Sequence, residues 1–157
     1  MSERIFWGHA ICRPKPTMLR IACSDPRFRI AFKGFTIEHL GFQPGQFVPI
    51  DIGGGPAALA HEILLNRDFD FLMSQIKFFL GHFPTIKTVV LIGHQDCGYY
   101  KTIPDHPDLK DKEKRDLPRA VNSLRSRLSD DVQVLAYYAS LEYERIAFED
   151  ILELATV

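Results

Sequence analysis

The sequence predicts an α/β fold in which a mostly parallel sheet of four to five strands is flanked by helices. Short apolar segments typical of strands alternate along the chain with segments whose apolar residues recur at helical spacing. Residues 88–92 form a continuous apolar run, which is expected of a strand buried on both faces of a parallel sheet. Parallel strands require crossover connections, and these place the helices on the faces of the sheet.

The size and composition of the chain fit one compact domain. Of its 157 residues, 46% are hydrophobic and 25% are charged, which is ordinary for a globular protein with a real core. Residues 1–16 contain Pro14 and Pro16 and are expected to form an irregular N-terminal arm. Residues 17–157 are expected to form the single domain.

The first half of this domain is predicted to hold two strands with a helix between them. Residues 18–23 form a short apolar strand, and residues 27–40 have a helical spacing of apolar side chains that ends at Gly41. Residues 46–52 read as the second strand. Pro49 has no N–H to donate, so it favours an edge position or a bulge for this strand.

A glycine-rich loop at residues 53–56 is followed by two predicted helices, at residues 57–65 and 69–80, the second of them capped by Gly81. The next strand is the apolar run already described. Residues 105–116 are polar and are predicted to be a solvated loop.

The last part of the chain is predicted to hold one helix and two strands. The apolar face of the helix consists of Leu117, Val121, Leu124 and Leu128. Residues 132–138 and 144–148 are the final strands, and the short interval between them is compatible with a hairpin.

Three metal-binding side chains stand at the ends of two predicted strands. Cys23 ends the first strand, whereas His94 and Cys97 follow residues 88–92. Sites in parallel sheets form beyond the carboxyl ends of the strands, so these side chains can converge. Thiolate and imidazole are ligands that zinc prefers, and three protein ligands leave a fourth position for water, as in catalytic sites. The sequence therefore predicts one Zn²⁺ per chain.

Asp25 and Arg27 follow Cys23 closely and can form an ion pair beside this metal. The guanidinium of Arg27 can hold the Asp25 carboxylate bidentately and keep it ionised. An ionised Asp25 could accept a hydrogen bond from water on the metal. If Arg27 released it, Asp25 could instead ligate the zinc and close the site.

These residues resemble the signature of the β-carbonic anhydrases, C-x-D-x-R followed by G-H-x-D-C-G. The first motif is read here as Cys23-Ser24-Asp25-Pro26-Arg27, and the second spans residues 93–98. Two further stretches are similar to the family: residues 45–48 with Gly53-Gly54, and residues 71–81 before the apolar strand. The similarity is clear from about residue 18 to residue 101 and looser beyond that.

The resemblance implies reversible hydration of carbon dioxide to bicarbonate by a zinc-bound hydroxide. It assigns Cys23, His94 and Cys97 as zinc ligands and Asp25 with Arg27 as the catalytic dyad. It also implies a β-carbonic-anhydrase-like sheet and a homodimer or a higher even homo-oligomer.

One departure from the family pattern bears on the substrate. Ile50-Asp51 stands where the family has Arg-Asn, so a cation is lost and a carboxylate is gained. This change would alter anion binding. Carbonyl sulfide or carbon disulfide is therefore an alternative substrate, and a zinc-binding homologue without catalysis is the alternative from another class.

Other candidate residues carry weaker signals. The remaining cysteine, Cys12, has no ligand spacing around it and is expected to be a bystander. His61-Glu62 opens like a zinc-protease motif, but Leu65 stands where the second histidine would be needed. His82 or His106 could shuttle protons, although nothing in the sequence places them near the metal.

Charge and hydropathy exclude some partners. The net charge of -1 gives no reason to expect binding to nucleic acid or an anionic membrane. No apolar run approaches the roughly 20 residues of a membrane helix, and the charged, proline-containing N-terminus is unlike a signal peptide. A cytoplasmic protein acting on a small molecule is expected.

Overall fold

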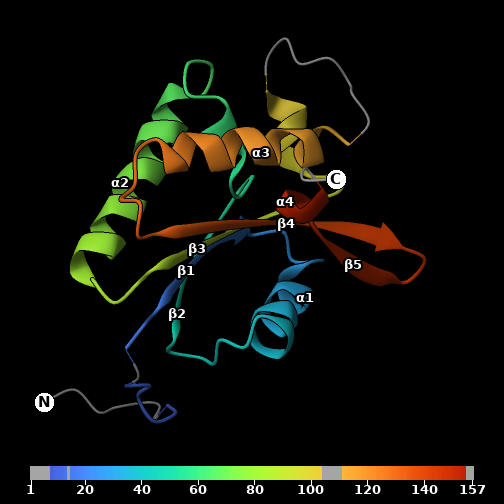
Figure 1. Ribbon diagram of the computed structural model, residues 1–157. Coiled ribbons are helices and arrows are strands. Elements are labelled where there is room, and N and C mark those ends of the chain that lie inside the picture. Colours follow the sequence, from blue (N-terminus) through green and yellow to red (C-terminus); the bar gives the residue numbers. More distant parts are fainter. Residues whose placement is uncertain (1–7, 14, 104–110, 155–157) are drawn as a thin grey trace, which may run out of the picture.

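The computed structural model describes residues 8–13, 15–103 and 111–154, and its centre is a five-stranded sheet (Figure 1). The strands are β1 (Met18–Cys23), β2 (Phe47–Ile52), β3 (Thr88–His94), β4 (Gln133–Glu142) and β5 (Arg145–Asp150), in the order β2-β1-β3-β4-β5. The first four are parallel, and β5 is antiparallel to β4 in a hairpin. The predicted fold class is therefore confirmed.

Helices cover both faces of the sheet (Figure 1). One face carries α2 (Asn66–His82) and α3 (Lys112–Arg125), whereas the other carries α1 (Arg29–Gly34) and the π-helical turn η1 (Phe35–His39). The remaining elements are two 3-10 turns, η2 (Ala57–Ala60) and η3 (Gly98–Thr102), and the short helix α4 (Ile151–Leu154).

The central strands are buried on both faces, as their composition predicts. All six residues of β1 are buried, and in β3 only Thr88 is partly exposed. Leu72 and Ile76 of α2 are fully buried against one face, and Phe28 and Phe32 are buried against the other. Each such side chain contributes about 1.5–3 kcal/mol by leaving water, so the sheet is held between two apolar layers.

Several predicted boundaries are corrected by the structure. The helix predicted at residues 57–65 is only the 3-10 turn η2, followed by further turns. The next helix, α2, begins at Asn66 rather than residue 69, and Gly81 lies inside it instead of capping it. β3 extends to His94, so this histidine is the last residue of the strand. Pro49 does lie on an edge strand, as predicted.

The largest correction concerns the predicted loop at residues 105–116. Residues 104–110 lie outside the described part of the chain, but α3 already begins at Lys112 and contains Pro118. Lys112 and Asp116 are buried rather than solvated. Part of this polar segment is therefore a helix in which Lys112 and Asp116 are buried.

In the described part of the chain, none of the helices combines the length and the apolar character needed to cross a bilayer.

Candidate metal centre

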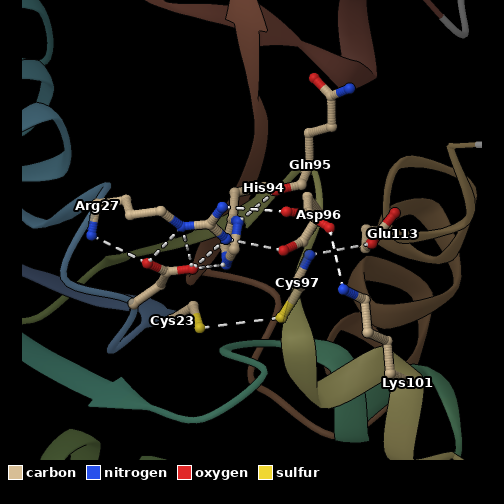
Figure 2. A network of polar contacts seen from close by, with 9 residues as sticks. Cys23, Arg27, His94, Gln95, Asp96, Cys97, Lys101 and Glu113 are labelled. Carbon is tan, nitrogen blue, oxygen red and sulfur yellow. Dashed lines mark hydrogen bonds and ion pairs between the residues drawn. The ribbon is translucent and has the colours of Figure 1, made fainter.

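The pairing of β1 with β3 brings the three candidate ligands together. Cys23 ends β1 and His94 ends β3, its parallel neighbour, while Cys97 follows a turn in which Asp96 has a φ of 57°. The ligand atoms of the three residues lie within 4.8 Å of one another, and all three residues are buried. Cys23 and Cys97 face each other across the site beside His94 (Figure 2).

The arrangement fits a tetrahedral metal ion. The two sulfur atoms are 3.9 Å apart. Two sulfurs each bound at about 2.3 Å to a tetrahedral zinc would be separated by about 3.8 Å. Nε2 of His94 is buried and makes no hydrogen bond to any residue in the described ranges. A buried acceptor beside two thiols is what a metal would satisfy.

The orientation of the His94 ring supports this interpretation. Nδ1 of His94 donates a hydrogen bond to the carbonyl of Gln95 at 2.8 Å, which directs the lone pair of Nε2 toward the sulfurs. The side-chain amide oxygen of Gln95 in turn accepts a hydrogen bond from the N–H of Leu141 on β4. The position of His94 is thus fixed, through Gln95, by β4, which pairs with β3 in the sheet.

The contact between the two thiols shifts their pKa values in opposite directions. The hydrogen bond from Cys97 lowers the pKa of Cys23 to about 4, against the opposing effect of burial. The same contact, together with burial, raises the pKa of Cys97. Burial also opposes the charged form of His94, but contacts with Cys23, Gln95 and Asp25 raise its pKa. Binding of a zinc ion would require both thiols in the deprotonated form.

Asp25 and Arg27 form a bidentate ion pair at the edge of the site. Nη2 of Arg27 lies 2.7 Å from Asp25 Oδ2, and Nε donates to Asp25 Oδ1 at 3.1 Å. These hydrogen bonds lower the pKa of Asp25. Asp25 Oδ2 is also 4.0 Å from Nε2 of His94. The carboxylate therefore lies beside the candidate ligand atoms and is ionised at neutral pH.

Arg27 also binds the segment that carries the other ligands, which the sequence alone did not reveal. Its Nη1 donates to Asp96 Oδ2 at 3.0 Å, and its Nη2 donates to the Asp96 carbonyl at 2.9 Å (Figure 2). Lys101 adds an ion pair to Asp96 at 3.3 Å. We call this connection between the Cys23 and Cys97 segments the Arg27 bridge. Asp96 is the aspartate of the second motif, but the motif does not show that Arg27 is its partner.

A narrow pocket adjoins the candidate metal centre. We call it the α3 pocket; its walls include His94, Cys97, Tyr100, Glu113, Asp116 and Leu117. Glu113 accepts a hydrogen bond from the N–H of Cys97 at 3.3 Å. Glu113 and Asp116 of α3 form a polar wall of the α3 pocket. The sequence predicted a loop for this segment and therefore did not reveal the pocket.

The structure also accounts for the carboxylate that replaces the family's cation. Asp51 on β2 is paired with Arg20 on β1, with Nη2 lying 3.1 Å from Oδ1. Arg20 is 5% exposed and also donates to Thr36 at 3.1 Å. The charge of Asp51 is therefore neutralised by Arg20 on the neighbouring strand β1.

Cys12 and His82 do not belong to the cluster of candidate ligands. Cys12 is exposed and free, and His82 is exposed at the end of α2. His106 lies outside the described residues.

A backbone contact at the site gives a stability prediction. Gly55 has a φ of +53°, and a Cβ there would lie 2.7 Å from the backbone nitrogen of Cys23. Gly55→Ala should therefore lower the free energy of unfolding by about 2 kcal/mol or more. Gly53→Ala is the matched control, since its Cβ would meet no described atom within 4 Å. Urea denaturation measures both, and equal stabilities would contradict the prediction.

Comparison with solved structures identifies the same architecture. A carbonic anhydrase from Streptococcus mutans aligns with a TM-score of 0.60 and 15% identity, covering 90% of this chain and 87% of that one. The β-carbonic anhydrase isoform I of Trichomonas vaginalis gives a TM-score of 0.53 and 11% identity, covering 91% and 87%. The β-carbonic anhydrase CcaA gives 0.51 and 16%, covering 87% and 74%.

Neither a family model nor a curated protein sequence matches the chain. At these identities the likeness is one of fold. The five-stranded order, the helices on both faces and coverage of about nine-tenths of the chain agree with the resemblance inferred from the motifs. The protein has the fold of the β-carbonic anhydrases.

Proposed function

We propose that this protein is a zinc enzyme that reversibly hydrates carbon dioxide to bicarbonate. The observation that carries the proposal is the set of two thiols and one imidazole beside an ion-paired carboxylate. The three ligand atoms lie within 4.8 Å of one another, and Asp25 approaches His94 to 4.0 Å. Three donors are one fewer than a closed structural zinc site uses, which favours catalysis.

Cys23, His94 and Cys97 would hold the ion. A bound zinc supplies Lewis acidity, which lowers the pKa of water enough to make it a nucleophile near neutral pH. Asp25 is an acceptor for a water hydrogen bond and can orient the water for attack on the carbon atom. Arg27 holds Asp25 through a bidentate contact and thereby keeps this carboxylate ionised.

The α3 pocket suits a small uncharged substrate. Its walls combine apolar groups, among them Pro56, Ala57, Leu117 and Ala120, with the polar groups described above. A linear triatomic molecule such as carbon dioxide needs little room and no charged partner.

Zinc content and the rate of carbon dioxide hydration, measured on the same purified sample, test the proposal. We expect about one zinc per chain and stopped-flow hydration well above the buffer rate. Release of hydrogen sulfide from carbonyl sulfide or carbon disulfide without hydration would select the sulfur hydrolase instead. Stoichiometric zinc with neither activity would select the non-catalytic homologue.

Three further expectations remain predictions. These are the arm at residues 1–16, the cytoplasmic location and the homodimer or higher even homo-oligomer. Sedimentation equilibrium of the zinc-loaded protein tests the last of them.

A further inference from the structure

A buried pair of side chains lies behind the α3 pocket and is unused by the chemistry described so far. Nε2 of His61 is 2.6 Å from Oδ2 of Asp116, and the two side chains are 10% and 7% exposed. Asp116 lies on α3 and contributes to the wall of the α3 pocket, together with His94 and Cys97. His61 follows η2 and retains a small solvent-exposed surface.

Hydration of carbon dioxide creates a need for such a pair. The balanced reaction, CO₂ + H₂O → HCO₃⁻ + H⁺, releases one proton in each turnover. The candidate ligands are buried, so the proton needs a route from the pocket to buffer. A carboxylate in hydrogen-bond contact with an imidazole provides one, because both groups can accept and release a proton.

We propose that Asp116 and His61 form this route, an inference that rests on the proposed function. The contact between Asp116 and Nε2 of His61, which is 2.6 Å long, holds one proton. When the other carboxyl oxygen of Asp116 accepts a proton from water in the α3 pocket, the shared proton moves onto Nε2. The resulting imidazolium releases its Nδ1 proton to buffer, and proton exchange with solvent then restores the starting tautomer of His61. No redox partner is needed, and the proton balance of each turnover closes.

The surroundings of Asp116 are compatible with this role. Tyr100 shares a hydrogen bond with Asp116, and burial and that contact raise the pKa of Tyr100, so the phenol stays protonated. Two cations of α3 also face Asp116: Lys112 interacts with it electrostatically, and Arg119 lies 4.0 Å from it.

The experiment compares steady-state hydration by the zinc-loaded wild type, His61→Gln and Asp116→Asn, with His82→Gln as control. His82 is exposed at the end of α2 and lines no part of the α3 pocket. We expect kcat to fall about tenfold or more in both pair variants, with kcat/KM within twofold of wild type and zinc content unchanged. Added imidazole buffer should restore kcat in His61→Gln, whereas His82→Gln should match wild type.

Three outcomes overturn the inference. An unchanged kcat in His61→Gln excludes the route, and an equal fall in kcat and kcat/KM without rescue shows a merely structural role. A wild type that does not hydrate carbon dioxide removes the proposed function itself.

A readout independent of turnover checks the geometry. The proton between His61 and Asp116 should give a strongly downfield ¹H resonance that is lost in His61→Gln and kept in His82→Gln. Absence of that resonance in an otherwise folded wild type would contradict the pairing.

Discussion

Replacing Cys97 with alanine should remove nearly all bound zinc. Binding free energies of four-ligand zinc sites are about 10–16 kcal/mol, or roughly 2.5–4 kcal/mol for each ligand. Loss of one thiolate should therefore weaken zinc binding about a hundredfold to a thousandfold. Cys97 is 3% exposed and its sulfur lies 3.9 Å from that of Cys23, so its removal takes one of the two thiols from the cluster.

Metal analysis after dialysis against a weak chelator measures this effect. Cys12→Ala is the matched control, because Cys12 is exposed and stands apart from the cluster. Circular dichroism establishes that Cys97→Ala still folds. Full zinc occupancy in a folded Cys97→Ala protein would refute the assignment of this ligand.

Asp25→Asn should keep the zinc and slow hydration by about a hundredfold or more. The amide has almost the same shape as the carboxylate, but it carries no charge and cannot accept a proton as a base. Arg27 would lose its strongest partner yet keep its hydrogen bonds to Asp96, so the local fold should survive. The loss should therefore appear in turnover and not in zinc content.

A surface aspartate provides the control for Asp25→Asn. Asp131 forms an ion pair with Lys87 at 2.6 Å and is 57% exposed, far along the chain from the ligands. Asp131→Asn should leave both zinc content and hydration unchanged. An unaltered rate in Asp25→Asn would exclude the proposed role of the Asp25 and Arg27 pair.

The sheet and the convergence of the three candidate ligands could be predicted because their signals are local. An apolar run such as residues 88–92 predicts a buried strand, and adjacent parallel strands place their carboxyl ends together. Cys23 and His94 each end such a strand. The two motifs then indicated which cysteines and which histidine are the candidate ligands.

The supporting residues could not be predicted because their partners are distant in sequence. Asp116 meets His61 across 55 positions, and Asp96 meets Arg27 across 69. The polar residues near Asp116 predicted a solvent-exposed loop. Asp116 instead lies on the same helix as Leu117, Val121 and Leu124, and it is buried together with them. Periodicity identifies the apolar face of a helix but does not reveal which polar neighbours become buried with it.

The Arg27 bridge has a consequence for how the protein would acquire a metal. The bridge joins the two segments that carry the candidate ligands through protein groups, so these contacts help to set the separation of the segments without a metal ion. Ordering a loop costs about 1–2 kcal/mol of conformational entropy per residue. In this protein the ordering takes place when the chain folds and not when an ion binds. Capture of zinc by the finished chain should resemble docking into a rigid receptor, and it can begin only after ribosomal synthesis has passed Cys97.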